Sequence, residues 1–388
     1  MEMRMGCVDI LERIVAFDTV SSRSNRDLAR FIAQYASEQG AHVRTLKHPD
    51  MDKHALHIVV GAVRGGGLAF AGHLDTVPVE GQAWTSDPFI LTRREGRLQG
   101  RGATDMKGFV ACCLSAIPEL CRMDLPFPVH MLLTYDEEVN AESARLLAAD
   151  LADQSLLPAA CIVGEPTGMR VVTDQKSKLV ALVQATGRPA HSSNPAAGVN
   201  AIDAVARAVA WLGAQARAAI ADGPFDKLFA PPHSTMNVGR IWGGISVNII
   251  PELAGFEVEW RGIPQDVPQH SLAKLSDYIN DVIVPTSGVR GECGFSISEV
   301  GWYPPLSRGG NAALADWVCG TLGVERDGGV SYATEAGVYQ QAGIATIICG
   351  PGSIAQAHKP DEWIDGAQLD VCVRAIPALS AAFGTLDG

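Results

Sequence analysis

The segment AFAGHLDTVP, residues 69–78, places His73 and Asp75 two positions apart, directly after a short apolar run. An imidazole nitrogen is a common ligand of zinc, and the other ring nitrogen usually donates a hydrogen bond to a carboxylate or carbonyl group. A single histidine in such a place more often packs in the core or faces solvent. The chemistry of this pair therefore depends on which other titratable residues the fold brings near it.

Carboxylates and a second histidine follow other apolar runs in the same way. Glu137 and Glu138 come after VHMLLTYD, Glu165 lies in AACIVGEP, and His358 follows ATIICG. Asp105 stands in GRGATDMKG, between a glycine-rich loop and an expected helix. Each has an ordinary explanation: Asp105 as a helix N-cap, and the adjacent glutamates as solvated loop charges. Their shared position at the ends of expected strands favours a single site.

Nitrogen and oxygen ligands of this kind fit zinc, with cobalt or manganese as substitutes. The chain can hold two zinc ions per subunit if one carboxylate bridges them, with the ions about 3.5–4 Å apart as in other two-metal hydrolases. Glu137 then serves as a general base, and Asp75 orients the ring of His73. The expected ligands are His73, Asp105, Glu138, Glu165 and His358.

The apolar runs predict the framework that positions these residues. Strands are expected over residues 56–63, 67–72, 129–135 and 159–164, and helices over residues 106–123 and 142–152. Strands that alternate with helices predict a mostly parallel sheet covered by helices on both faces. Ligands of such α/β sheets bind beyond the carboxyl ends of the strands, which is where the candidate residues are expected.

Residues 178–300 follow a different order, strand, helix, strand, strand, helix, strand, which is typical of a ferredoxin-like α+β unit. Such a compact unit is easily inserted into a host domain. We therefore expect residues 1–177 and 301–388 to form the two parts of an α/β catalytic domain around this insertion.

The composition excludes several classes of partner. With 31 Lys and Arg against 43 Asp and Glu, the 388-residue chain has a net charge of −12, which argues against nucleic acid or an anionic membrane as partner. Asp9, Glu12 and Arg13 interrupt the apolar N-terminal pattern, unlike a signal peptide. Nine cysteines without CxxC spacing are typical of free thiols in a reducing compartment. We expect a cytoplasmic protein.

Six motifs resemble, in order, those of the dizinc aminoacylase and exopeptidase family, and the resemblance covers essentially the whole chain. The motifs are GHLDTVP, GRGATDMKG, DEE, VGEPT, GRPAHSSNPAAGVNAI and GPGSIAQAHKPDEW. Within the family, the stretches EAGVYQQAG, NVGRIWGGISVNIIPE and FEVEWRGIP are most similar to the acetylornithine deacetylase branch. The resemblance assigns His73, Asp105 and Glu165 to one zinc ion and Asp105, Glu138 and His358 to the other. It makes Glu137 the general base and Asp75 the orienting acid.

The resemblance also implies that the inserted unit, residues 178–300, is a lid that forms a homodimer. His191 would reach across the dimer to stabilise the oxyanion in the partner's site. Arg261 would bind the carboxylate of the substrate, with Asn248 expected beside it. Without the resemblance, His191 is interpreted as a surface histidine and Arg261 as a charge on a strand face. Glu335 is expected to be an exposed loop acid that pairs with the ammonium group of a basic substrate.

The function that the resemblance implies is hydrolysis of N-acetylornithine to ornithine and acetate, a step of arginine biosynthesis. Activated water would attack the acyl carbonyl, with Glu137 moving the proton. Residues 139–147 and 171–179 depart from the deacetylase pattern at the pocket rim, which leaves other substrates open. The alternatives are a deacylase or desuccinylase for another N-acyl amino acid, a dipeptidase or carboxypeptidase, and more remotely a non-catalytic ligand-binding protein.

Overall fold

The computed structural model describes residues 5–287 and 292–385. The chain divides into two compact units, and each is described here by itself. Unit 1 comprises residues 1–174, 306–328 and 334–388, and unit 2 comprises residues 175–305 and 329–333. The short return at 329–333 brings β13 (Gly329–Val330) beside β8 (Asp174–Gln175), a pairing that the sequence pattern did not indicate.

Unit 1 is built on a six-stranded sheet with the order β1-β2-β6-β3-β7-β14. The three pairings from β6 to β14 are parallel, whereas β1 and β2 join the sheet in antiparallel fashion. The strands are β1 (His42–Lys47), β2 (His54–Val60), β3 (Leu68–His73), β6 (Val129–Thr134), β7 (Ala160–Val163) and β14 (Ala345–Ile348). Strands β3, β6 and β7 are buried along their whole length, as expected for a sheet covered on both faces.

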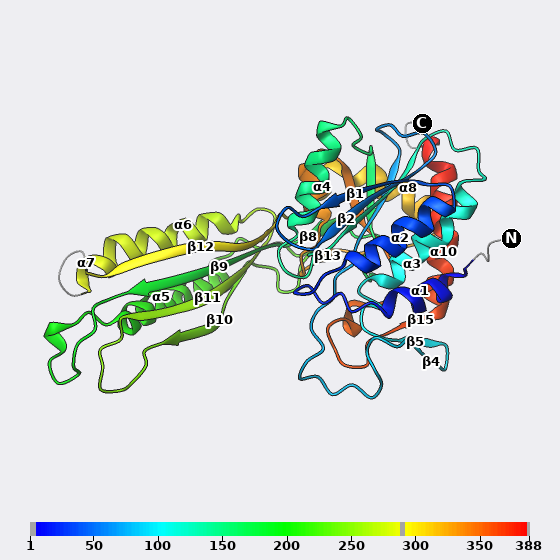
Figure 1. Cartoon of the computed structure of the whole chain (residues 1–388). Coiled ribbons are helices and arrows are strands. Elements are labelled where there is room, and N and C mark those ends of the chain that lie inside the picture. The colour runs from blue at the N-terminus through cyan, green and yellow to red at the C-terminus, as the bar shows by residue number, and fades with distance from the viewer. Residues whose placement is uncertain (1–4, 288–291, 386–388) are drawn as a thin grey trace. The chain divides into compact units, whose positions relative to one another are not determined.

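Two groups of helices cover this sheet (Figure 1). The larger group consists of α1 (Cys7–Val15), α2 (Arg26–Glu38), α3 (Lys107–Leu120), α8 (Ala312–Leu322) and α10 (Gly366–Ala382). Helices α4 (Glu142–Asp153) and α9 (Ala336–Gln341) form the second group and pack against β6 and β7, respectively. A small sheet of β4 (Thr92–Arg94), β5 (Arg97–Gln99) and β15 (Trp363–Asp365) completes unit 1. The predicted fold class, a mostly parallel sheet with helical layers, is confirmed.

Glycine at the end of β7 allows helix α3 to approach the sheet closely. A Cβ atom added at Gly164 would lie 2.1 Å from the ring of Phe109, so no larger residue fits without displacing α3. The main core of unit 1 lies between the sheet and the helices of the larger group, and it contains Phe109 and Ile162. This packing fixes the point at which the chain leaves β7, one residue before Glu165.

Unit 2 has the predicted βαββαβ order. Its elements are β9 (Ser177–Thr186), α5 (Ala201–Asp222), β10 (Thr235–Gly243), β11 (Leu253–Gly262), α6 (Pro268–Tyr278) and β12 (Gly294–Tyr303). A π-helical turn, Ile279–Ile283, and α7 (Val284–Thr286) extend α6. The sheet is antiparallel with the order β10-β11-β9-β12, and α5 and α6 pack on it and on each other (Figure 1).

Short 3-10 helices occupy the connecting segments Pro195–Ala197, Arg308–Gly310, Ile354–Gln356 and Phe383–Thr385. Across the described parts of the chain, no helix is both long enough and apolar enough to cross a membrane.

Candidate metal centre

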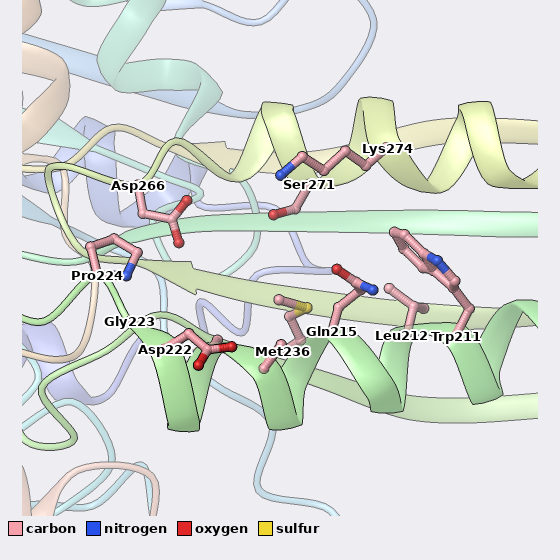
Figure 2. A pocket seen from close by; sticks show the side chains of 12 residues that line it. Trp211, Leu212, Gln215, Asp222, Gly223, Pro224, Met236, Asp266, Ser271 and Lys274 are labelled. Carbon is pink, nitrogen blue, oxygen red and sulfur yellow. The ribbon is translucent and has the colours of Figure 1, made fainter.

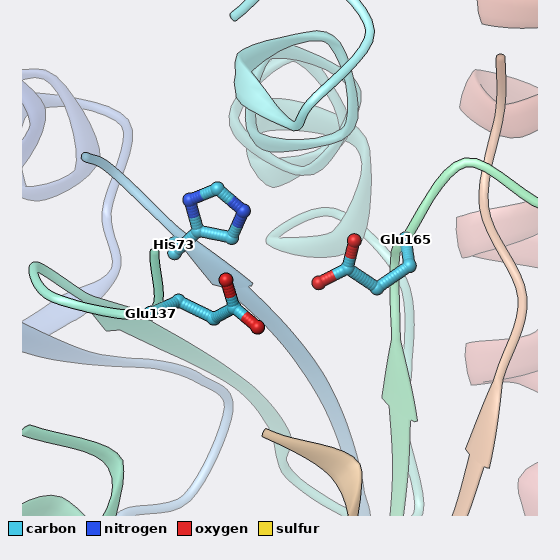
Figure 3. A group of neighbouring side chains, drawn as sticks. All are labelled: His73, Glu137 and Glu165. Carbon is cyan, nitrogen blue, oxygen red and sulfur yellow. The ribbon is translucent and has the colours of Figure 1, made fainter. Parts of the chain in front are cut away.

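Three adjacent strands deliver titratable side chains to one place in unit 1. His73 is the last residue of β3, Glu137 follows the end of β6, and Glu165 follows the end of β7. Because β3 lies between β6 and β7 and runs parallel to both, the three strand ends meet at the same edge of the sheet. Figure 3 shows the three side chains pointing toward one shared space.

Asp105 lies between the two histidines. Its Oδ1 is 3.1 Å from His73 Nε2, and its Oδ2 is 3.2 Å from His358 Nε2. The same nitrogen of His358 lies 3.1 Å from Oε2 of Glu138. The structure therefore brings together His73, Asp105, Glu138 and His358, although His358 lies 220 residues beyond Glu138 in the chain.

The two ordinary explanations of these carboxylates are wrong. Met106, rather than Asp105, precedes α3 as its N-cap residue, and the Asp105 side chain faces the histidines. Glu137 is buried, with 8% of its surface exposed, so it is not a solvated loop charge.

The donor set fits divalent metal ions. The ligand atoms of His73, Asp105 and Glu138 lie within 4.8 Å of one another, and so do those of His73, Glu137 and Glu165. Zinc binds imidazole nitrogen and carboxylate oxygen at about 2.0–2.2 Å, so its ligand atoms must lie close together, as they do here. Oε1 of Glu165 is buried and has no hydrogen-bond partner among the described residues. A cation would satisfy this oxygen and offset the crowded negative charges.

The pKa values of these residues reflect that crowding. Burial raises the pKa of Glu165, and the charge of Asp105 raises it further. Burial opposes the charged form of His73, but its bonds to Asp105 and Asp75 outweigh that effect and raise its pKa well above the usual range. The bonds to Asp105 and Glu138 raise the pKa of His358 to about 10. Without a cation the histidines hold protons, and metal binding must displace them.

Asp75 forms hydrogen bonds with more residues of the site than its position beside His73 predicted. Nδ1 of His73 lies 3.0 Å from the backbone oxygen of Asp75 and 3.4 Å from its Oδ1, so Nδ1–H donates toward Asp75 and Nε2 faces Asp105. The carboxylate of Asp75 also accepts hydrogen bonds from the backbone N–H groups of Glu137 and Glu138, at 3.1 and 3.2 Å, and from Oγ of Ser21 at 2.6 Å.

Glu335 is not the exposed loop acid expected from the sequence, because it lies at the start of α9 with 1% of its surface exposed. Its Oε2 accepts a 3.4 Å hydrogen bond from the hydroxyl of Tyr339, and its Oε1 has no partner among the described residues. Burial raises the pKa of Glu335 to about 8, although a hydrogen bond with Thr134 and the charge of His73 act in the opposite direction. Glu335 therefore lies near the candidate metal ligands.

The remaining predicted residues belong to unit 2, where they lie at two different places. His191 forms a β-bridge with Ile249, and the backbone N–H of Ser192 donates to the carbonyl of Asn248 at 3.0 Å. Arg261 lies at the far end of β11, roughly 25 Å away at about 3.3 Å per residue, and its guanidinium is paired with Glu259. Within one chain, Asn248 is therefore a neighbour of His191 and not of Arg261.

Unit 2 also contains a groove between α5 and α6, shown in Figure 2. Trp211, Asp222, Asp266 and Lys274 are among the residues that line it. None of the residues predicted to do chemistry contributes to this groove.

Two buried charged residues near the metal centre were missed by the sequence interpretation. Arg101 and Glu362 form an ion pair of 2.7 Å beside the loop that carries Asp105. Arg101 lies in the motif GRGATDMKG and Glu362 at the end of the motif GPGSIAQAHKPDEW. A charged residue in each of these two loops was the signal from which the pair could have been predicted.

Comparison with known proteins identifies the family. Residues 69–382 match the model of peptidase family M20/M25/M40. The chain belongs to this family. An acetylornithine deacetylase of Yersinia pseudotuberculosis serotype O:1b (strain IP 31758) is 34% identical to this M20 protein over 366 residues, which cover 92% of this chain and 90% of the relative.

Solved structures of M20 proteins share the fold. An M20 family metallo-carboxypeptidase of Sulfolobus solfataricus has a TM-score of 0.78 at 16% identity, covering 99% of this chain and 100% of that chain. A dinuclear metal-binding peptidase of the M20 family from Bacillus subtilis has a TM-score of 0.67 at 13% identity, with 97% of each chain covered. The protein described here is thus an M20 metal-dependent hydrolase with candidate ligand groups at the strand ends of its sheet.

Proposed function

We propose that the protein hydrolyses N-acetylornithine to ornithine and acetate, using two zinc ions held at the strand ends of unit 1. The observation that carries this proposal is the position of Asp105, whose two carboxylate oxygens lie beside His73 and His358, respectively. A carboxylate placed in this way is suited to bridge two ions. The 34% identity to a Yersinia acetylornithine deacetylase supports the choice of substrate.

His73, Asp105 and Glu165 would hold one ion, and Asp105, Glu138 and His358 the other. Bound divalent ions would polarise the acyl carbonyl and make a water molecule more acidic. Cobalt or manganese would be accepted by the same nitrogen and oxygen ligands.

Glu137 is the proposed general base. Its carboxylate would take a proton from the attacking water and deliver it to the nitrogen of the leaving amine. In the metal-free protein, burial raises the pKa of Glu137 well above the usual range, and the nearby charge of Glu165 raises it further. Glu137 also lies within 4.8 Å of ligand atoms of His73 and Glu165, so its role as base must be separated from a ligand role by experiment.

Unit 2 would act as a lid and form a homodimer. The hairpin between β10 and β11 exposes apolar side chains that usually lie in a core or an interface, with Ile245 88% exposed and Val247 99% exposed. The edge strand β10 continues this surface, and a second copy of the chain would cover both. His191 and Asn248 lie in the same region and would then enter the partner's site, where His191 would stabilise the oxyanion.

The substrate would be bound at both ends. Arg261 would bind its carboxylate, since a guanidinium forms paired hydrogen bonds with a carboxylate, and the substrate would have to displace Glu259 from it. Glu335 would bind the side-chain ammonium, which would stabilise the charged form of this buried acid. In this role the enzyme would supply ornithine to arginine biosynthesis in the cytoplasm. Other N-acyl amino acids and dipeptides remain the alternative substrates.

A substrate panel tests this proposal. Acetate and free amine would be measured with N-acetylornithine, N-acetyl amino acids with neutral and acidic side chains, N-succinyl-diaminopimelate and several dipeptides, each with zinc, with cobalt and after chelation. We expect metal-dependent turnover that is fastest with N-acetylornithine. Faster turnover of another compound would make that compound the substrate in place of N-acetylornithine. No turnover with metal bound would contradict the catalytic proposal.

A further inference from the structure

A buried ion pair lies beside the loop that carries Asp105. Arg101 and Glu362 are each 1% exposed, and Nη1 of Arg101 donates to Oε2 of Glu362 at 2.7 Å. A buried ion pair contributes little to stability on average, because the desolvation of both charges offsets their attraction. The burial of these two charges is therefore better explained by the other groups that the two side chains bind.

The Glu362 carboxylate holds the backbone of the Asp105 loop. It accepts hydrogen bonds from the backbone N–H groups of Gly102, Thr104 and Asp105, at 3.1, 2.8 and 3.1 Å. Gly102 adopts a positive φ of 80°, which an L-residue rarely adopts, so the loop turns sharply around this carboxylate. Three N–H groups that donate to one carboxylate fix the conformation of the loop. They thereby fix the position of the Asp105 backbone, from which its side chain projects.

Arg101 extends the same cluster to the second histidine. Its Nη2 donates to Oε1 of Gln82 at 2.5 Å, and Nε2 of Gln82 donates to the backbone oxygen of His358 at 3.1 Å. The backbone of His358 has a φ of 62°, an uncommon conformation for a residue other than glycine that must be held by its surroundings. Nη1 of Arg101 also reaches the carbonyl of Lys359 at 3.4 Å.

We propose that Glu362, Arg101 and Gln82 form a positioning cluster that sets the metal affinity of the centre, because it orients Asp105 and His358 through their backbones. This inference rests on the proposed function of Asp105 and His358 as metal ligands. Glu362 and Gln82 contact the backbone of Asp105 and His358, respectively, so the cluster acts through the residues that it holds.

The test measures metal binding directly and does not depend on turnover. Metal-free wild type and Glu362→Gln would be titrated with Zn²⁺ by calorimetry and with Co²⁺ by visible absorption, which reports the coordination geometry. Glutamine keeps the shape of Glu362 but loses the charge and one acceptor oxygen. We expect about 10- to 100-fold weaker Zn²⁺ binding, the usual effect of removing a residue that orients a metal ligand, together with a changed Co²⁺ spectrum.

Asp361→Asn is the matched control. Oδ1 of Asp361 accepts hydrogen bonds from the backbone N–H of Thr85 and from Nε2 of Gln99, at 2.9 and 2.8 Å, and both of these partners lie outside residues 101–105. This variant removes a carboxylate from the neighbouring position and should bind Zn²⁺ like the wild type.

A second variant covers the case in which Glu362→Gln does not fold. Gln82 is only partly buried, and Gln82→Leu removes both its bond to His358 and its bond to Arg101 while it keeps both members of the ion pair. We expect Gln82→Leu to lower the affinity for the ion held by His358 about tenfold and to leave the affinity for the other ion unchanged. Wild-type affinity in Glu362→Gln, or in Gln82→Leu where Glu362→Gln is unfolded, would overturn the inference. Failure of the wild type itself to bind metal would instead contradict the proposed function.

Discussion

The carboxylate of Asp75 accepts a hydrogen bond from the backbone N–H of Glu137, with 3.1 Å between Oδ1 and the nitrogen. The same carboxylate accepts the N–H of Glu138, so one side chain at the end of β3 holds the chain where it leaves β6. Burial opposes the ionised form of Asp75, but the bonds to His73 and Ser21 and the charge of Lys53 outweigh that effect and lower its pKa. Asp75 thus connects the orientation of His73 to the position of the proposed base.

Replacing Asp75 with asparagine should weaken both metal binding and catalysis. The asparagine amide nitrogen cannot accept a hydrogen bond, so the N–H of Glu137 or that of Glu138 loses its acceptor. We expect Zn²⁺ affinity and kcat to fall about 10- to 100-fold. Calorimetry and steady-state kinetics measure the two effects. Ser21→Ala, which removes only a donor to Asp75, serves as control and should change both quantities less.

Replacing Glu137 with glutamine should separate catalysis from metal binding. Glutamine cannot take a proton, so we expect kcat to fall about 10²- to 10⁴-fold. Metal analysis should still find the wild-type metal content, because Glu137 is not a proposed ligand. The exposed Glu142 at the start of α4 is the control position, and Glu142→Gln should retain activity. Loss of metal from Glu137→Gln would show that this residue is a ligand.

Replacing Glu335 with glutamine should affect basic substrates selectively. A hydrogen bond to a charged group contributes about 1.5–3 kcal/mol, which corresponds to roughly a tenfold or larger rise in KM for N-acetylornithine. KM for N-acetylmethionine, which has a neutral side chain, should stay the same. Tyr339→Phe removes only the hydroxyl that contacts Glu335 and is the control. Equal changes with both substrates would exclude Glu335 as the ammonium partner.

The His57–His130 pair should make the protein less stable in acid. Both rings are fully buried, and Nε2 of His130 lies 3.0 Å from the carbonyl of Gly66. Nε2–H of His130 therefore donates to that carbonyl, and its Nδ1 accepts from Nε2 of His57 at 2.9 Å, an arrangement of two neutral rings. Burial lowers the pKa of His57 to about 3 and that of His130 to about 4.

The sign of this pH dependence follows from proton uptake. A histidine in the unfolded chain has a pKa of about 6.5. Between this pH and the lower pKa values of the folded protein, the unfolded chain binds more protons than the folded one. The free energy of unfolding therefore decreases as the pH falls through this range. Each histidine contributes a slope of up to about 1.4 kcal/mol per pH unit. Urea unfolding in excess chelator should give a shallower slope for His57→Gln than for the wild type. Equal slopes between pH 6.5 and 4.5 would contradict the neutral pair.

Mixing two inactive variants tests whether His191 acts across a dimer. In a mixed dimer of His191→Ala and Glu137→Gln, one site keeps its own Glu137 and receives His191 from the partner. We expect that mixture to regain activity, whereas a His191 that serves its own subunit would leave both sites inactive. Val247→Asp should prevent dimerisation in analytical ultracentrifugation, and Val300→Asp on the opposite edge strand, β12, should not.

The sequence predicts the strand-end position of these candidate residues well because that position depends on local patterns. The apolar runs before His73, Glu137 and Glu165 identify buried strands, and the parallel order of those strands brings their ends together. The βαββαβ order of unit 2 can also be predicted from local patterns, because each of its elements has a clear hydrophobic periodicity.

What the sequence did not reveal depends on contacts between distant segments. Glu335 reads as a loop acid because α9 is only six residues long, and its burial comes from packing against the sheet. The Arg101–Glu362 pair joins loops 261 residues apart, which no local pattern indicates. Asn248 lies in the turn before β11 and Arg261 near the end of β11, so the length of this strand separates two residues that are close in the sequence.

The most direct test of the account is a crystal structure of the zinc-loaded protein with anomalous data collected at the zinc edge. If Asp105 bridges two ions, we expect two anomalous peaks about 3.5–4 Å apart, one on each side of the Asp105 carboxylate, with Glu137 outside the coordination of both. A single peak, or peaks that do not share Asp105, would contradict the bridging role on which the proposed mechanism depends.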